Sequence, residues 1–230
     1  MTRSALLLLA DPRFPAGAHA FSGGLEAAAA AGRVTDTASL RAFLVGRLHT
    51  GALTAAAFAA AACQADRAEL LADLDHEYDV RLAAGQARTA SRRHGRLFAR
   101  AARAAWPGPR FELLDEALPA EQGAHHPIAL GVACASAGLS AEDAASCAVH
   151  ATLDAPAQAA IRLLGLDPVE VATLLAGLAP TADRIAARAL TSARMALLKS
   201  EPGLLPALGS PLLDLAAQDH ATWEVRLFAT

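Results

Sequence analysis

The sequence reads Leu53-Thr-Ala-Ala-Ala-Phe-Ala-Ala-Ala-Ala-Cys-Gln64 along one stretch, in which seven of the twelve residues are alanine. Alanine is the strongest intrinsic helix former, so this stretch predicts a helix. Its small side chain on every face lets neighbouring backbones approach closely, and we therefore expect this helix to lie at the centre of the fold. The β-branched and aromatic residues that favour strands are scarce, and aromatic residues make up only 4% of the chain. The sequence predicts an all-α protein.

Start and stop signals on both sides of this stretch predict about ten helices in all. Gly51 is expected to separate the alanine-rich helix from the one before it, and Pro180 to end one helix before the next begins. Ser140 and Asp143 have the spacing of a capping box, which marks a helix start. Because no linker or internal repeat interrupts the pattern, residues 1–230 are predicted to form a single compact domain.

Residues 200–230 form a proline-rich C-terminal segment, which we expect to be a docking element. One long helix is prevented there by three prolines, Pro202, Pro206 and Pro211. The segment is therefore expected to have few internal hydrogen bonds. Large aromatic residues and arginine dominate the energetics of protein interfaces, and the chain ends with such residues between Trp223 and Phe228. The alternative is that Trp223 and Phe228 fold back onto the core.

The charge balance indicates no general attraction to nucleic acid or to an anionic membrane. The 230 residues include 20 basic and 23 acidic side chains, a net charge of −3, and 54% of them are hydrophobic, which excludes intrinsic disorder. Seven arginines lie between Arg81 and Arg103 without stacking aromatics, which favours a solvated or protein-docking face. Because of these arginines, a helical regulator of transcription remains a lesser alternative.

No uninterrupted apolar stretch approaches the ~20 residues that span a bilayer, so a cytoplasmic protein is expected.

No catalytic constellation is recognisable in the sequence. The phosphate-binding loop with its lysine, the His-Glu-x-x-His motif and paired Cys-x-x-Cys spacings are all absent, and the three cysteines are too widely spaced for a disulfide framework. Adjacent His125 and His126 are weak metal candidates, but they precede Pro127 at a helix start, where their side chains should diverge. We expect no tightly bound cofactor and no metal. A helical enzyme that binds a small molecule or cofactor remains an alternative.

A turn rich in proline and glycine near the N-terminus reads Phe14-Pro-Ala-Gly-Ala-His-Ala-Phe-Ser-Gly-Gly-Leu-Glu26. Together with Gly51-Ala-Leu-Thr54, His126-Pro-Ile-Ala-Leu-Gly131 and Arg226-Leu-Phe228, it resembles the UreF-type urease accessory proteins, in the right order over nearly the whole chain. Six positions match the opening stretch of that family: Pro15, Gly17, Ser22, Gly24, Leu25 and Glu26. Departures at His19, at Phe21 and at the final two residues indicate a divergent, actinobacterial-type member.

This resemblance implies an all-helical, homodimeric and non-enzymatic helper of urease maturation. Members of the family bind the accessory protein UreD (also called UreH), and together they recruit the GTPase UreG and deliver nickel to apo-urease, so that nickel is handled by the complex. The resemblance implies partner-binding roles for Ser22, Glu26, Trp223, Arg226, Leu227 and Phe228. It implies a structural turn at Pro15, Gly17 and Gly24.

Two interpretations of Glu26 follow from this assignment. The first is that Ser22 caps the following helix and Glu26, in its first turn, belongs to a surface presented to UreG. The second is purely structural, since a carboxylate in the first turn of a helix is stabilised by the helix dipole by about 0.3–1 kcal/mol.

Overall fold

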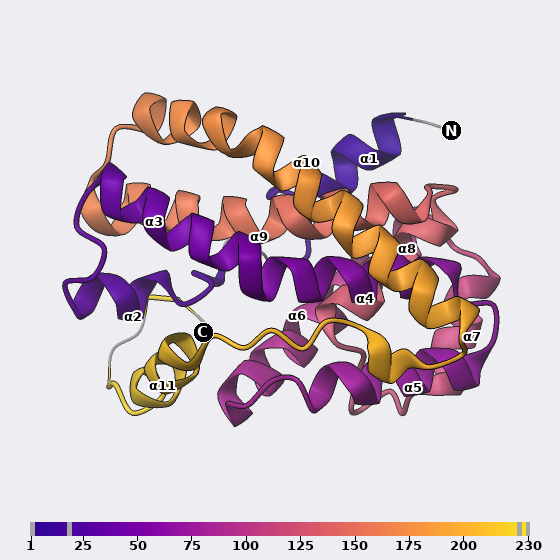
Figure 1. Cartoon of the computed structure of the whole chain (residues 1–230). Coiled ribbons are helices and arrows are strands. Elements are labelled where there is room, and N and C mark those ends of the chain that lie inside the picture. Colours follow the sequence, from indigo (N-terminus) through magenta and orange to yellow (C-terminus); the bar gives the residue numbers. More distant parts are fainter. Residues whose placement is uncertain (1–2, 18–19, 225–226, 229–230) are drawn as a thin grey trace.

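The computed structural model describes residues 3–17, 20–224, 227 and 228 (Figure 1). Apart from a single-residue bridge at Phe21, the described residues form helices, turns and irregular segments, which confirms the all-α prediction. The α-helices are α1 (Arg3–Ala10), α2 (Leu25–Ala30), α3 (Thr37–Arg47), α4 (Leu53–Gln64), α5 (Ala68–Asp79), α6 (Gly85–Ala105), α7 (Pro109–Ala117), α8 (His126–Ser136), α9 (Ala141–Leu164), α10 (Pro168–Leu198) and α11 (Pro211–His220).

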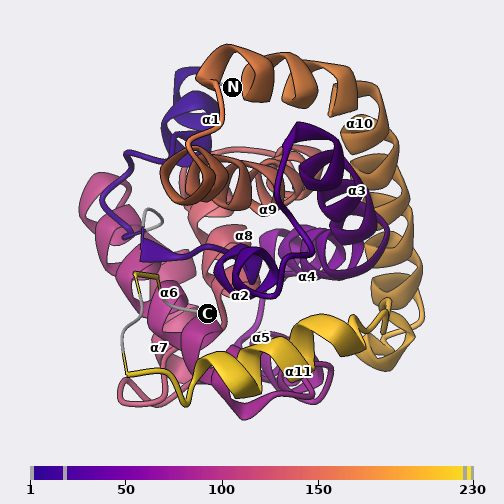
Figure 2. The same ribbon diagram turned by 90° about the vertical axis from the view of Figure 1, so that its left-hand side faces the viewer.

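Helix α4 is the centre of the fold, as its alanine content predicts. Every residue from Ala56 to Cys63 is buried, and the helix packs against α8, α9 and α10. Viewed end-on, α4, α8 and α9 lie in the middle of the molecule and the other helices surround them (Figure 2). Because methyl groups are the main side chains on α4, its neighbours lie close to its backbone.

The contact between α8 and α4 predicts the effect of one substitution. A Cβ atom added to Gly131 would lie 2.4 Å from the carbonyl oxygen of Ala59 and 2.8 Å from the backbone nitrogen of Cys63. We expect Gly131→Ala to lower the free energy of unfolding by about 1–3 kcal/mol, because the two helices must move apart. The control is Gly46→Ala on α3, where the added Cβ meets nothing within 4 Å. Urea denaturation should show a loss only for the first variant, and equal stability of the two would contradict the close packing.

Two of the expected helix breaks are wrong. At Gly51, a π-helical segment, Leu48–Ala52, joins α3 and α4 into a continuous run. At Pro180, α10 continues for 31 residues, from Pro168 to Leu198, and Figure 1 shows it changing direction along its length. A proline inside a helix removes one hydrogen bond and bends the helix axis. Packing of α10 against α4 and α9 stabilises the helix in spite of this loss.

The expected capping box at the start of α9 is confirmed. The hydroxyl oxygen of Ser140 accepts a hydrogen bond from the backbone nitrogen of Asp143 at 3.2 Å, and the Asp143 carboxylate accepts one from the backbone nitrogen of Ser140 at 2.8 Å. The local spacing of a serine and an acidic residue was therefore enough to locate this helix start.

One helical run is more apolar than the sequence analysis expects. Residues Thr37–Gln64 form 28 residues of helix that are long and apolar enough to cross a membrane. Half of the most apolar window of this run is buried within the fold, and core helices of soluble proteins pass the same test. Its second part is α4, so its apolar character is explained by its place in the core.

The C-terminal segment has more structure than the prolines predict. Pro211 occupies the first turn of α11, where its missing N–H has no partner to lose, so it begins a ten-residue helix. Helix α11 packs against α2 and α6 (Figures 1 and 2). The last part of the chain therefore returns to the turn near the N-terminus.

Candidate functional site

The carboxylate of Glu26 joins the N-terminal turn to the end of the chain. Its Oε2 atom accepts hydrogen bonds from Nε2 of His220 at 2.8 Å and from the backbone nitrogen of Phe228 at 3.1 Å. Its Oε1 atom accepts one from the backbone nitrogen of Leu227 at 2.9 Å. Glu26 is 7% exposed and His220 1% exposed. We call this set the Glu26 latch: the Glu26 carboxylate, the His220 ring and the backbone N–H groups of Leu227 and Phe228.

The side chains around the latch divide into a buried and an exposed group. The Phe228 ring is 7% exposed and lies beneath the guanidinium of Arg162, whose Cζ is 4.4 Å from the ring centre. Trp223 is half-buried, with its ring 4.7 Å from that of His220. Leu227 is 71% exposed although its backbone nitrogen is held by Glu26. Phe228 thus folds back onto the helices, as the alternative expected, and Leu227 faces outward.

The N-terminal turn brings Glu26 to this place through its glycines. Gly17 and Gly24 have φ angles of +75° and +87°, in the left-handed region that favours glycine. Helix α2 begins at Leu25 with Gly24 as its N-cap residue, so the expectation that Ser22 is the cap is wrong. The Ser22 hydroxyl is buried and accepts a hydrogen bond from the backbone nitrogen of Glu26 at 3.4 Å, one turn further along.

The structure thus brings together most of the predicted partner-binding residues, which the sequence separates by about two hundred positions. Ser22, Glu26, Trp223, Leu227 and Phe228 lie around the latch, and Pro15 lies in the turn before it. Arg226 lies outside the described residues. Because Glu26 is covered by the tail, a direct contact between its carboxylate and a partner would require the tail to move away; its role in partner binding stays a prediction.

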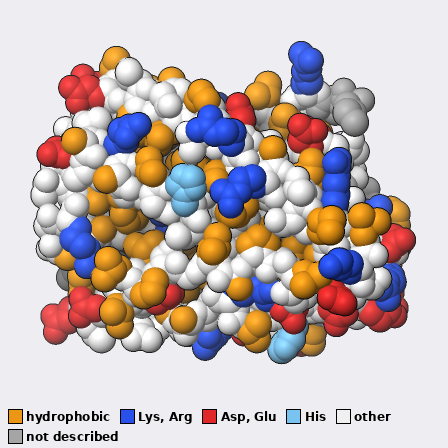
Figure 3. All heavy atoms as spheres, viewed as in Figure 1, with side chains coloured by type: hydrophobic (Ala, Val, Ile, Leu, Met, Phe, Trp, Pro, Cys, Tyr) orange, Lys and Arg blue, Asp and Glu red, His pale blue; other side chains and the backbone are white. Residues whose placement is uncertain are grey.

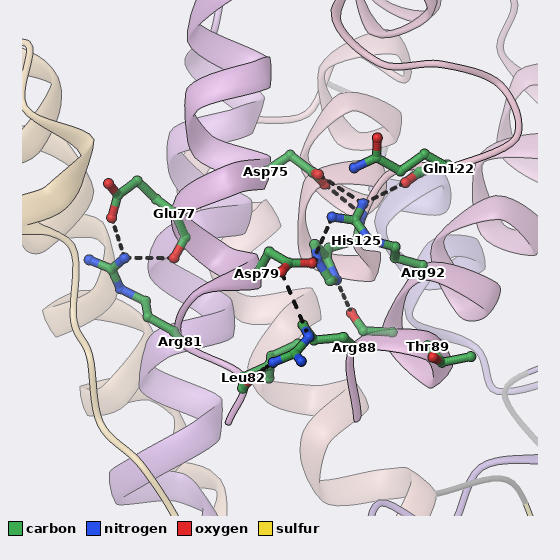
Figure 4. Close-up of polar contacts among 12 residues, drawn as sticks. Asp75, Glu77, Asp79, Arg81, Leu82, Arg88, Thr89, Arg92, Gln122 and His125 are labelled. Atoms are coloured by element: carbon green, nitrogen blue, oxygen red, sulfur yellow. Dashed lines mark hydrogen bonds and ion pairs between the residues drawn. The ribbon is translucent and has the colours of Figure 1, made fainter. Parts of the chain in front are cut away.

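His125 and His126 lie in different surroundings, as their place at a helix start predicts. His125 is fully buried, its Nε2 atom is 3.0 Å from Oδ1 of Asp79 and its Nδ1 atom is 3.0 Å from the hydroxyl of Ser91 (Figure 4). The His126 ring instead stacks on that of His94, with ring centres 3.9 Å apart. Burial lowers the pKa of His125, and that of His126 falls well below the usual histidine value.

A network of charges surrounds His125 (Figure 4). Arg92 donates hydrogen bonds to Asp75 at 2.9 Å and to Asp79 at 2.8 Å, and the backbone nitrogen of His125 donates to Asp75 at 2.8 Å. Burial pushes the pKa of Asp79 upward, but hydrogen bonds from His125 and Arg92 outweigh it and lower the pKa. These contacts connect α5, α6 and the start of α8.

The order Asp79, His125, Ser91 resembles the arrangement of a nucleophilic serine with its base. Here Asp79 is also bound by Arg92, and the Ser91 hydroxyl accepts a hydrogen bond from the backbone nitrogen of His126 at 3.3 Å. These extra bonds give the three residues a structural role between helices. Among the residues that the structure describes, no group of three or more His, Cys, Asp or Glu side chains is placed to hold a metal ion.

Several arginines of residues 81–103 bind other segments of the chain, which the sequence does not predict. Arg81 donates to the backbone carbonyls of Gly203, Leu205 and Pro206 at 3.0 Å each, which ties the C-terminal segment to α5. Arg103 forms an ion pair with Asp115 on α7. Arg103 remains exposed, whereas Arg81 is half-buried against the C-terminal segment, so the expected solvated or protein-docking face describes only part of this set. Carbonyl partners carry no sequence signal, because every residue has one.

Comparison with known proteins gives concordant matches. A sequence model of the family described as UreF matches residues 34–179. The chain is 43% identical over 229 residues to the "Urease accessory protein UreF" of Mycobacterium sp. (strain JLS), covering 100% of this chain and 99% of that protein. It is 42% identical over 230 residues to the protein of the same name from Mycobacterium marinum, with coverage of 100% and 99%. It is 40% identical over 221 residues to that of Mycobacterium tuberculosis (strain H37Rv), with coverage of 96% and 95%.

Proposed function

The chain belongs to the UreF family, and on this basis we propose that it is a non-enzymatic accessory protein of urease maturation. In this proposal it acts in the cytoplasm as a scaffold: with UreD (UreH) it recruits the GTPase UreG and supports insertion of nickel into apo-urease. Nickel is cargo of the complex, and the chain itself needs no tightly bound cofactor. The observation that carries the proposal is the Glu26 latch, which joins the family's opening turn to the C-terminal segment.

The surface around the latch fits the docking of UreD. The latch holds the backbone of residues 227 and 228 in place, while the Leu227 side chain remains 71% exposed and Trp223 half-exposed. A segment that is already ordered loses less conformational entropy on binding, which favours affinity. Tryptophan is also among the residues that contribute most to interfaces. We therefore place the UreD contact on this surface.

UreG recruitment would depend on Glu26 indirectly. The carboxylate is 7% exposed and satisfied by the tail, so it supports the docking surface and does not form part of it. Loss of Glu26 would displace the tail, weaken the complex with UreD and thereby reduce capture of UreG.

Homodimerisation is supported by exposed apolar side chains near the C-terminal end. Of the twelve large hydrophobic residues that are exposed in the described part of the chain, six lie between Met195 and Leu215. Figure 3 shows hydrophobic side chains at many places between charged ones on the face seen in Figure 1. These six exposed apolar side chains are surface that a second copy of the chain would cover. Sedimentation of a purely monomeric species, both alone at micromolar concentration and in the partner complex, would contradict the dimer.

Co-expression with UreD and UreG tests the proposal. The chain should co-elute with UreD on size exclusion, and UreG should join this complex in a manner that depends on nickel and guanine nucleotide. A stable chain that elutes alone under all conditions would refute the scaffold role. The alternative of a helical enzyme that binds a small molecule or cofactor would then remain.

Deleting residues 223–230 should remove binding to UreD. The deletion takes away Trp223, the exposed Leu227 and two of the three hydrogen bonds to Glu26, and losing such anchors costs several kcal/mol of affinity, about 2–4 kcal/mol for each hot-spot residue. The α4-centred core should keep its helical circular dichroism. Titration calorimetry with UreD measures the loss; normal affinity of the truncated chain would show that the tail is not the docking element.

A further inference from the structure

A cavity of about 290 Å³ lies next to the Glu26 latch, and neither the proposed function nor the family match accounts for it. Its walls come from the turn before α2, from α3, α6 and α9, and from α11. Alanine, proline, leucine and aromatic side chains make up most of the lining. The polar side chains that matter for its chemistry are those of Arg47 and His94.

Arg47 is a cation without a matching charge. Its Nη1 atom donates to the carbonyl oxygen of Gly23 at 2.7 Å, while its buried Nε has no hydrogen-bond partner. No ion pair among the described residues includes Arg47, and Asp214, the acidic residue of the lining, is not within pairing distance. Burial lowers the pKa of Arg47 to about 10, so it stays charged at neutral pH. Arg81 and Arg92, by contrast, are each paired with carboxylates.

Gly23 leaves the Arg47 side chain open to a ligand, and His94 lines the same cavity. Gly23 has a φ of +59°, and a Cβ atom in its place would lie 3.3 Å from Arg47 Nη2, so the glycine keeps the guanidinium uncovered. His94 stacks between Phe21, at 4.6 Å, and His126, at 3.9 Å, and its buried Nε2 also has no partner. Burial lowers the pKa of His94 to about 4, so at neutral pH its ring is uncharged and can donate one hydrogen bond.

We propose that this cavity binds a small organic carboxylate, which pairs with the guanidinium of Arg47. The planar fork of arginine donors matches a carboxylate, and a buried charge without a partner is costly unless a ligand supplies one. Because the remaining lining is mainly apolar, an apolar body attached to the carboxylate fits better than a bare inorganic oxyanion. His94, on α6, also lines the cavity.

The test uses the purified full-length chain with sodium benzoate as the probe. Benzoate should raise the melting temperature in a saturable manner beyond sodium chloride of equal ionic strength, since a ligand that binds only the folded state stabilises it. Sodium phosphate should give no more than the chloride effect. Calorimetry should show that Arg47→Met weakens benzoate binding about tenfold or more, as expected for the loss of a charge-assisted hydrogen-bonded pair.

The matched control is Arg41→Met, because Arg41 lies exposed on the same helix and should not affect benzoate binding. If Arg47→Met does not fold, Ala151→Leu narrows the cavity without touching Arg47 and should also abolish binding. Unchanged benzoate affinity in the folded variants, or no benzoate effect beyond chloride, would overturn the proposal. Phosphate binding through Arg47 as tight as that of benzoate would overturn the choice of an organic ligand.

Discussion

Replacing Asp75 with alanine is expected to lower the free energy of unfolding by about 3 kcal/mol, because it removes one of the two carboxylates that bind the half-buried Arg92 and leaves a buried backbone N–H group without its acceptor. The Asp75 side chain is 1% exposed and accepts hydrogen bonds from Arg92 and from the backbone nitrogen of His125. Without it, that buried N–H group at the start of α8 has no partner, which adds a desolvation cost. Urea denaturation measures the change as a lower midpoint with an unchanged slope.

The matched control for this prediction is Asp73→Ala on the same helix. Asp73 is exposed, and surface substitutions usually change stability by no more than about 0.5 kcal/mol. If the two variants were equally stable, the network around His125 would not be the connection between α5, α6 and α8 described above.

Glu26→Gln should release the C-terminal segment while leaving the helical core intact. A glutamine amide places N–H donors opposite the donors of His220 and Phe228, so at least one buried hydrogen bond is lost at a cost of about 1–3 kcal/mol. Since this cost falls on a local opening, amide hydrogen exchange at residues 227 and 228 should accelerate about tenfold or more. The midpoint of global unfolding should change little.

Glu224→Gln is the control for the latch, because Glu224 lies in the same segment but is exposed. It should leave the exchange of both amides as in the unchanged chain. Protection that persists in Glu26→Gln would show that other contacts hold the tail and that the latch is not the decisive one.

The sequence predicts those parts of the fold that depend on local chemistry. The alanine content from Leu53 to Gln64 identified both the helix and its central position, because small side chains act on every face. Ser140 and Asp143 located the start of α9 through their spacing alone. The helix end expected at Pro180 was wrong, because a proline only bends a helix whose two halves are held by tertiary packing. The local sequence does not show this packing.

The candidate site depends on contacts that no local pattern reveals. Glu26 and Leu227 are 201 positions apart, and the bond between them uses a backbone N–H, which every residue except proline offers. The resemblance to the family identified both residues as partner-binding, but it did not indicate that they contact each other. The burial of Glu26 likewise follows from the return of α11 to α2.

The affinity of Glu26→Gln for UreD tests most directly the proposal that the Glu26 latch builds the surface to which UreD binds. Titration calorimetry should show binding weakened about tenfold or more for Glu26→Gln and unchanged for Glu224→Gln, with both variants folded by circular dichroism. Wild-type affinity in a Glu26→Gln chain whose tail amides exchange freely would contradict the claim.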